Sequence, residues 1–428
     1  MLKRTSIALV FSLCGACIAG PSVTYIKPGY LASSLSYDGT AAAGNVVSDA
    51  SYETFRWTAT DGATRLGLAS YPVIGRAAGT PNVSFDGKRV SASIVSSDMQ
   101  LTQGLWAIAS GWTELMPPEA PGGALVDDGY GSAWGLSGNG ACVTGFFWSP
   151  SYRAQASLWS SATGVTALGQ VAGRSARANA ANYDGSVVGG WEENEAGSWM
   201  PRAWRGGTKY ELHNDDGGVN QVEAVSASGN VLGGSSRDND VAYNVATLWY
   251  WNGVSYDTVQ IGALADAYPE QTTAAVLGVS ADGSIAVGVH MAFWGSTSGF
   301  VWTASTGLIP ATDYFASIGA PIPEGSIVLD CAAISADGST IAVTVMDAET
   351  SQLRTALVRS RAVCPGDLNN DGQVDDADFV WFAAQYDVLA CDDSAMPGYC
   401  RADINNDGAV DDADFVLFAQ AYDQLICP

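Results

Sequence analysis

Two stretches near the C-terminus share a pattern of oxygen-bearing side chains. One begins at Asp367 and the other, of almost the same sequence, begins 36 residues later at Asp403. In each, Asp or Asn occupies positions 1, 3, 5, 9 and 12 and Gly occupies position 6, which is the spacing of an EF-hand calcium loop. Calcium binds about six to eight hard oxygen ligands, and four carboxylates with one amide supply most of them.

The ligands predicted for the two loops are equivalent, with a main-chain carbonyl added at position 7. The first set is Asp367, Asn369, Asp371, Gln373, Asp375 and Asp378, and the second is Asp403, Asn405, Asp407, Ala409, Asp411 and Asp414. Gly372 and Gly408 would let the chain turn sharply beneath each ion. The sequence therefore predicts two calcium ions as cofactors.

Each loop leads into a pattern typical of an amphipathic helix. Apolar residues fall at i, i+3, i+4 and i+7 from Phe379 and again from Phe415. Pro365-Gly366 stands where the helix that precedes an EF-hand loop would end, so only the exiting helix is expected.

A duplicated calcium loop with only its exiting helix resembles a dockerin, the module that attaches secreted enzymes and binding proteins to cohesin receptors. The resemblance covers residues 364–428. In dockerins, loop positions 10 and 11 and the following helix surface contact the cohesin. The contact residues implied here are Asp376, Ala377, Asp412 and Ala413, although they could simply face solvent. The family's usual Ser/Thr-type pair is absent, which leaves a different cohesin open, and near-identical halves imply two possible binding orientations.

The N-terminus is typical of an export signal. Lys3 and Arg4 precede an apolar run from Ile7 to Cys17, and cleavage is expected after Ala19. Processing as a lipoprotein at Cys17 is the alternative. The run is shorter than the ~20 residues of a membrane span, so we expect a secreted, extracellular protein.

Most cysteines outside the signal lie in the C-terminal module, where disulfides can support a small core. We predict Cys391–Cys400, within the linker between the halves, and Cys364–Cys427, joining ends that a pseudo-twofold axis brings together. Cys142 and Cys331 fall in distant repeats and are expected to stay as buried thiols.

Composition and charge exclude some functions and divide the chain. With 44 acidic and 19 basic residues the net charge is -25, which would repel nucleic acid and anionic lipid headgroups. Residues 364–428 hold 14 Asp and a single base, Arg401, so the charge density changes sharply at Cys364. We expect a signal peptide at 1–19, a large domain at 20–361 and a dockerin at 362–428.

The large domain contains a phrase that recurs seven times. A turn glycine lies in each of Asp38-Gly39, Asp86-Gly87, Asn139-Gly140, Asp184-Gly185, Ser228-Gly229, Asp282-Gly283 and Asp337-Gly338. A bulky residue follows each after 18 to 20 positions, at Trp57, Trp106, Trp159, Trp204, Trp249, Trp302 and Leu357-Val358. Each repeat fits four antiparallel strands, and seven repeats predict an all-β, seven-bladed β-propeller. Ser22–Ile26 is the segment placed to complete the last blade, and each Trp is expected between neighbouring blades.

The repeat phrase, with its Ser-x-Asp-Gly turn and Trp-Thr strand, resembles the extracellular repeat family named for a His-Ala-Phe triplet. The triplet itself is absent, since the corresponding positions read Thr54-Phe55-Arg56-Trp57 in the first repeat. The resemblance spans most of residues 31–361. It implies a surface or secreted protein without implying a reaction.

Few residues suggest catalysis. The histidines are His213 and His290, far apart in the chain, and the densest acidic cluster is Glu192-Glu193-Asn194-Glu195 between Trp191 and Trp199. That cluster could act on a sugar or form a solvated hairpin loop. The preferred hypothesis is a non-catalytic binding protein anchored by dockerin–cohesin contact in an extracellular polysaccharide-degrading system. The alternative is a propeller glycoside hydrolase or polysaccharide lyase with the same anchor.

Overall fold

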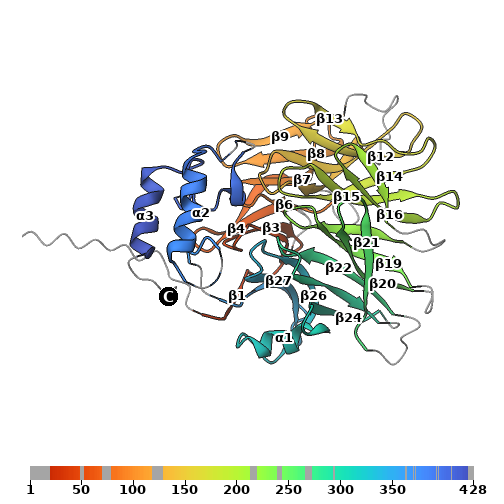
Figure 1. The fold of residues 1–428 in the computed structure, drawn as a ribbon. Helices are drawn as coiled ribbons and strands as arrows, with labels where there is room; N and C mark the ends of the chain where they lie inside the picture. Colours follow the sequence, from red (N-terminus) through yellow and green to blue (C-terminus); the bar gives the residue numbers. More distant parts are fainter. Residues whose placement is uncertain are drawn as a thin grey trace, which may run out of the picture.

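The computed structural model describes most of the chain. The described residues are 20–48, 53–69, 79–117, 129–212, 219–238, 243–265, 272–292, 295–361, 364–369, 371, 373–391, 393, 395–405 and 407–422. They contain seven antiparallel four-stranded sheets arranged as the blades of a propeller, followed by a small helical module (Figure 1). The predicted seven-bladed β-propeller is therefore confirmed.

Six blades are built from four consecutive strands each, and strand order within each sheet follows the sequence. Blades 1 to 3 are β2 (Tyr30–Leu35), β3 (Ala41–Val46), β4 (Glu53–Thr58) and β5 (Gly62–Ala69); β6 (Asn82–Val83), β7 (Arg89–Val95), β8 (Leu101–Ala107) and β9 (Gly111–Leu115); β10 (Gly131–Leu136), β11 (Cys142–Trp148), β12 (Ala154–Ser160) and β13 (Gly164–Ala167). Blades 4 to 6 are β14 (Ala176–Ala181), β15 (Val187–Glu193), β16 (Trp199–Arg205) and β17 (Thr208–Glu211); β18 (Gln221–Val225), β19 (Val231–Arg237), β20 (Asn244–Trp251) and β21 (Tyr256–Gly262); β22 (Thr273–Val279), β23 (Ile285–Met291), β24 (Thr297–Thr303) and β25 (Gly307–Pro310).

Blade 7 joins the two ends of the propeller. Its inner strands are β26 (Ser326–Ile334), β27 (Thr340–Asp347) and β28 (Leu353–Arg359), and its outer strand is β1 (Ser22–Tyr25). β1 runs antiparallel to β28, with Ser22 opposite Arg359 and Tyr25 opposite Ala356. The predicted closure by the N-terminal segment is confirmed, because β28 would otherwise leave an unpaired edge.

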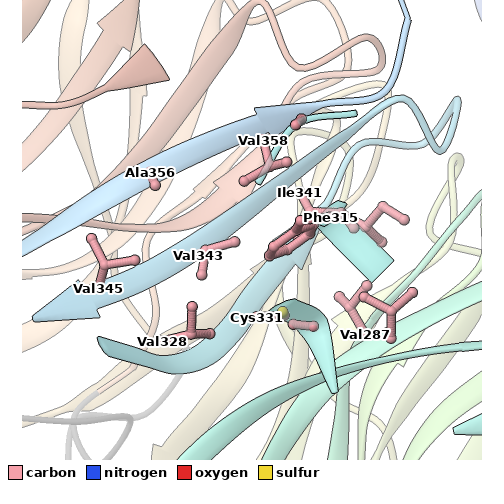
Figure 2. Close-up of a cluster of buried hydrophobic side chains, with 13 residues drawn as sticks. Val287, Phe315, Val328, Cys331, Ile341, Val343, Val345, Ala356 and Val358 are labelled. Atoms are coloured by element: carbon pink, nitrogen blue, oxygen red, sulfur yellow. The ribbon is translucent and has the colours of Figure 1, made fainter. Parts of the chain in front are cut away.

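A buried apolar cluster supports this closure. Val287 and Val301 of blade 6 pack with blade 7 side chains from Val328 to Val358, a cluster shown in Figure 2. Val23 and Tyr25 of β1 pack against it. Phe315, also in the cluster, belongs to α1 (Ala311–Ser317), a helix after β25 that the repeat pattern did not predict.

The recurring phrase forms the turn between the first two strands of each blade, as Ser-x-Asp-Gly in blades 1, 2, 6 and 7 and as Ser-x-Asn-Gly, Asn-x-Asp-Gly and Ser-x-Ser-Gly in blades 3, 4 and 5. In blade 6, the Ser280 hydroxyl accepts a hydrogen bond from the Ile285 amide at 3.1 Å and donates to the Asp282 carboxylate at 2.6 Å. The Asp282 carboxylate also accepts from the Ser284 amide at 2.9 Å. Gly283 has φ of 73°, and a Cβ there would lie 2.3 Å from Val231 in blade 5. The motif thus serves the turn and the close approach of neighbouring blades.

The tryptophan landmarks pack between blades where they are fully buried. Trp249 of blade 5 lies with Val187, Ala203 and Leu212 of blade 4, and its indole N–H donates to the Leu212 carbonyl at 3.3 Å. Trp57 of blade 1 packs against blade 7 in the same way. Trp106, Trp159 and Trp302 are only partly buried.

The two cysteines of the propeller are free thiols. Cys331 is buried, as expected. Cys142 is half-buried rather than buried, because it begins β11 beside the Gly185 turn of the next blade. Burial, and to a smaller extent the negative charge of Asp184, raises the pKa of the Cys142 thiol.

The C-terminal module consists of α2 (Asp376–Tyr386), the short 3-10 helix η3 (Pro397–Cys400) and α3 (Asp412–Tyr422). α2 and α3 pack through Phe382 and Phe418, whose ring centroids lie 5.1 Å apart. The structure contains the Cys391–Cys400 disulfide, and Cys364 is also disulfide-bonded. Cys427, its expected partner, lies outside the described residues. No helix in the described part of the chain is long and apolar enough to cross a membrane.

Removal of residues 20–27 should lower the melting temperature of the propeller in one cooperative step. The deletion takes away β1 and the buried Ile26, so β28 loses its partner strand and the apolar cluster loses its cover. Differential scanning calorimetry of the mature chain measures the effect. Thr24→Ser, at an exposed position of β1, is the matched control and should melt like the parent. A deletion variant with the parent's melting temperature would show that closure depends on other contacts.

Candidate metal centre in the two acidic loops

The first loop folds around the carboxylate at its twelfth position. Asp378 is fully buried in α2, and its two oxygens accept hydrogen bonds from the amides of Asn369 at 2.9 Å and Asp375 at 3.0 Å. The Asp371 amide donates to Asp367 at 3.0 Å and to the Asn369 side chain at 2.8 Å. Backbone donors therefore hold the oxygen-bearing side chains toward the inside of the loop.

The second loop repeats this arrangement. Asp414 is fully buried and accepts from the amides of Asn405 at 2.9 Å and Asp411 at 3.0 Å. The Asp407 amide donates to Asp403 at 2.9 Å and to Asn405 at 2.8 Å. The two loops therefore share the same pattern of amide hydrogen bonds.

Three of the predicted ligands of the second loop come together, and the described residues of the first loop form no equivalent group of three carboxylates. One carboxylate oxygen from each of Asp403, Asp407 and Asp414 lies within 4.8 Å of the others. Burial raises the pKa of Asp403. The hydrogen bond from the Gly408 amide and the charge of Lys88 act to lower it, but the effect of burial is larger. Carboxylates this close repel one another unless a cation lies between them. The donor set, all oxygen and mostly charged, fits a hard divalent ion such as calcium.

The predicted ligands at positions 7 and 9 take part in hydrogen bonds within the loops. Asp375 and Asp411, at position 9, each accept from a main-chain amide two residues ahead at 2.8 Å and so cap the following helix. The amides of Gln373 and Ala409, at position 7, donate to Asp371 at 2.9 Å and to Asp407 at 3.0 Å. Gly408 has φ of 102°, in the left-handed region that favours glycine, whereas Gly372 lies outside the described residues.

The residues at positions 10 and 11 lie where the two halves meet. Asp376, Ala377, Asp412 and Ala413 are all exposed. The Tyr422 hydroxyl at the end of α3 donates to Asp376 at 2.5 Å, and the Tyr386 hydroxyl at the end of α2 donates to Asp412 at 2.6 Å. These hydrogen bonds raise the pKa of both tyrosines. The reciprocal pairing relates the helices by a pseudo-twofold axis.

Next to these residues the module exposes apolar side chains that the sequence pattern had placed differently. Phe379 and Phe415 were expected on the buried faces of their helices, yet they are 46% and 44% exposed. Val380 and Val416 are 67% and 54% exposed. The signal was present in the sequence, since four consecutive apolar residues, 379–382 and 415–418, surround each helix and cannot all face the core. The exposed surface formed by Phe379, Val380, Phe415 and Val416 is called the helix-start patch below.

The acidic cluster of blade 4 does not form a pair of free carboxyl groups. Glu192 is buried and lies 2.7 Å from the Lys209 ammonium and 3.5 Å from the Arg202 guanidinium. Burial acts to raise the pKa of Glu192, but the hydrogen bonds from Lys209 and the Val171 amide lower it overall. A general acid of glycoside hydrolysis needs a raised pKa, so Glu192 does not have this property.

Glu193 and Glu195 lie on a small open pocket instead. Arg153 is 3.7 Å from Glu193 and Arg174 is 3.4 Å from Glu195, and all four line a cavity of about 330 Å³. Trp191 and Trp199, which flank the cluster, stack with ring centroids 4.0 Å apart. His290 is buried in β23, and His213 lies outside the described residues.

Comparisons with known proteins give only distant similarities. No protein-family model and no curated protein matches the chain. Among solved structures, TolB from Acinetobacter baumannii is 11% identical with a TM-score of 0.39, and the similarity covers 76% of this chain and 66% of TolB. The propeller domain of the trilobed protease from Pyrococcus furiosus is 8% identical with a TM-score of 0.47, covering 79% and 95% of the two chains. Oligogalacturonate lyase from Vibrio parahaemolyticus is 10% identical with a TM-score of 0.49, covering 79% and 91%.

Glu192→Gln should lower the free energy of unfolding by about 3 kcal/mol, because Lys209 and the buried Arg202 both lose a buried charged partner. Arg202 keeps the pairing with the largely exposed Glu211 at 3.3 Å. Glu195→Gln is the control, since the side chain of Glu195 is 94% exposed and its ion pair is worth less than about 1 kcal/mol. Urea denaturation of both variants measures the difference. The pKa of Glu192 is lowered in the folded state, so its contribution should vanish as the pH falls through that pKa. Equal effects of the two substitutions would contradict the buried ion pair.

Proposed function

We propose that this chain is a secreted, calcium-binding, dockerin-bearing β-propeller that acts as a non-catalytic binding component of an extracellular polysaccharide-degrading system. The observation that carries the proposal is the duplicated geometry of the acidic loops. Two sequences 36 residues apart place the same donors at the same positions and bury the same carboxylate. Such repetition is what two calcium sites in a pseudo-symmetric module require.

Calcium would be held by Asp367, Asn369, Asp371, Asp375 and Asp378 with the Gln373 carbonyl, and by the equivalent residues from Asp403 to Asp414. When bound, the ions supply positive charge to a region of 14 Asp and one base. This chain's own residues position the ligands through the amide hydrogen bonds to Asp378 and Asp414. The role of the metal is therefore structural, because it allows the acidic loops to fold.

A cohesin-type receptor would bind across the starts of α2 and α3. The helix-start patch supplies apolar area, and Asp376 and Asp412 beside it supply charge. Exposed apolar side chains in a group indicate an interaction surface. Because the pseudo-twofold axis exchanges the two halves, either half could occupy the same site on the receptor.

Binding rather than catalysis is supported by the blade 4 cluster. Its carboxylates are each paired with a basic side chain, and that of Glu192 has a lowered pKa. The pocket between Arg153, Arg174, Glu193 and Glu195 has the size and polarity to hold a sugar unit. Incubation of the full chain with a panel of polysaccharides, with binding and product release scored separately, tests this part of the proposal; product release would favour a hydrolase or lyase.

Calorimetric titration of the full mature chain with calcium should show two sites in the C-terminal module. Asp371→Ala and Asp407→Ala should each remove one of them, because each deletes a charged ligand from one loop. Asp387→Ala, at an exposed position after α2, is the control and should leave both sites. Loss of neither site in the two loop variants would rule out these ligand sets.

The double variant Phe379→Ser with Phe415→Ser should weaken binding to a cohesin-type partner by at least about tenfold, since both copies of the apolar anchor are lost. Each single variant should weaken it by only about twofold, since one of two equivalent orientations remains. Surface plasmon resonance against a panel of cohesin domains measures this. Val254→Ser, at an exposed propeller position, should have no effect. A large loss in one single variant alone would show that binding uses one orientation.

A further inference from the structure

One tyrosine of the C-terminal module lies against the propeller. The ring centroid of Tyr399 is 4.9 Å from that of Tyr183 and 6.1 Å from those of Tyr37 and Phe85. These three residues, called the aromatic socket, belong to blades 4, 1 and 2. All three rings lie in the turns between the first two strands of their blades, so Tyr399 lies against that end of the propeller. In Figure 1, η3 lies between the module's helices and the blades.

The aromatic socket arises from the variable position of an otherwise regular turn. The residue before each turn's Asp-Gly or equivalent pair is Tyr37, Phe85, Gly138, Tyr183, Ala227, Ala281 or Ala336 in blades 1 to 7. Aromatic rings therefore gather on one side of the ring of turns. At Gly138, a Cβ would lie 2.8 Å from the Tyr183 ring and 3.0 Å from the Phe85 ring, so glycine makes room for them.

The backbone of the socket is fixed by hydrogen bonds between blades. The Tyr37 amide donates to the Phe85 carbonyl at 3.0 Å, the Phe85 amide to the Gly138 carbonyl at 2.7 Å, and the Tyr183 amide to the Ala227 carbonyl at 3.0 Å. The turns thus hold one another from blade to blade. A receptor surface fixed before binding spends little free energy on ordering its side chains.

The module presents Tyr399 in an unusual backbone conformation. Tyr399 has φ of 65° and Cys400 has φ of 55°, in the left-handed region, which costs a non-glycine residue about 1 kcal/mol or more. The Cys391–Cys400 disulfide and the packing of Gly398 against Trp381 and Gln385 of α2 hold this segment. A tight turn that points one ring outward matches the role of an anchor.

The segment after Tyr399 connects the aromatic socket to both acidic loops. The Arg401 guanidinium lies 5.0 Å from the ring centre of Tyr37 and donates to the carbonyls of Leu368 and, at 2.8 Å, of Asp367 in the first loop. Asp403, two residues further on, opens the second loop. An ion that orders the acidic loops would therefore also order Arg401 and the nearby Tyr399, which contact the propeller.

We propose that Tyr399 is a latch by which the metal-loaded C-terminal module docks onto the aromatic socket of its own propeller. The calcium dependence rests on the proposed function, whereas the docking itself stands on the ring contacts. Docking makes the two modules one rigid unit, with the helix-start patch left exposed for a partner. It also covers the Asp-Gly end of the propeller, so that a propeller ligand is directed to the opposite end. The pocket lined by Glu193 and Glu195 lies there, beside the loop between β15 and β16.

Small-angle X-ray scattering of the full mature chain tests the latch. With calcium the parent should be compact. Tyr399→Ala and the socket variant Tyr183→Ala should both shift to a larger radius of gyration, and Tyr399→Phe, which keeps the ring, should restore the compact form. Tyr152→Ala, at an exposed tyrosine of blade 3, is the control and should match the parent.

Calorimetry on the same samples separates this proposal from the calcium sites. Tyr399→Ala should still bind two calcium ions while it scatters as two separated modules. If the parent binds no calcium and Tyr399→Ala still expands, the latch holds and the proposed function fails. If chelator leaves the calcium-bound parent equally compact, the coupling to the metal is wrong. Identical scattering of Tyr399→Ala, Tyr183→Ala and the parent would overturn the latch itself.

Discussion

The pairing of β1 with β28 is the contact on which the propeller depends. Each blade keeps an edge strand on its outer side, so the contribution of β1 is to place strands from both ends of the chain in one sheet, and the ring cannot open there without breaking their pairing. Because the outer strand of blade 7 comes from residue 22 onward and its inner strands from residue 326 onward, the chain's two distant parts must meet before the ring is stable. Stability of each blade is thereby tied to that of all the others.

Closure of the ring fixes the distance between neighbouring blades, and this distance is short at the Asp-Gly turns. The missing Cβ of Gly283 leaves room for Val231 of the neighbouring blade, and that of Gly39 leaves room for Thr340 across the closure from blade 7. Within each turn, Ser or Asn satisfies a buried amide that would otherwise cost about 1 to 3 kcal/mol. These requirements restrict the first, third and fourth residues of the turn phrase. The second residue is free to vary. The aromatic socket lies at that variable position.

Structural features that recur along the chain could be predicted from the sequence. Seven repeats of turn and tryptophan predicted the blades, and the unassigned segment at Val23 and Tyr25 predicted the closing strand, because both follow from counting periodic landmarks. Features that occur once were not predictable in this way. α1 has no counterpart in the other repeats, and the half-burial of Cys142 depends on the turn of another blade. Tyr399 gave no signal because its partners lie more than 200 residues away in the chain.

The same distinction applies to the acidic loops, where local spacing defines the donors but the fold decides what they can do. Asp378 and Asp414 are buried between the loop amides that donate to them and the helices α2 and α3, which pack through Phe382 and Phe418. The fold thus holds carboxylates close together although their charges repel one another. A cation that relieves this repulsion strengthens the helix packing, and through Arg401 it also steadies the segment that carries Tyr399. In this way a local charge imbalance can control how the module meets the propeller.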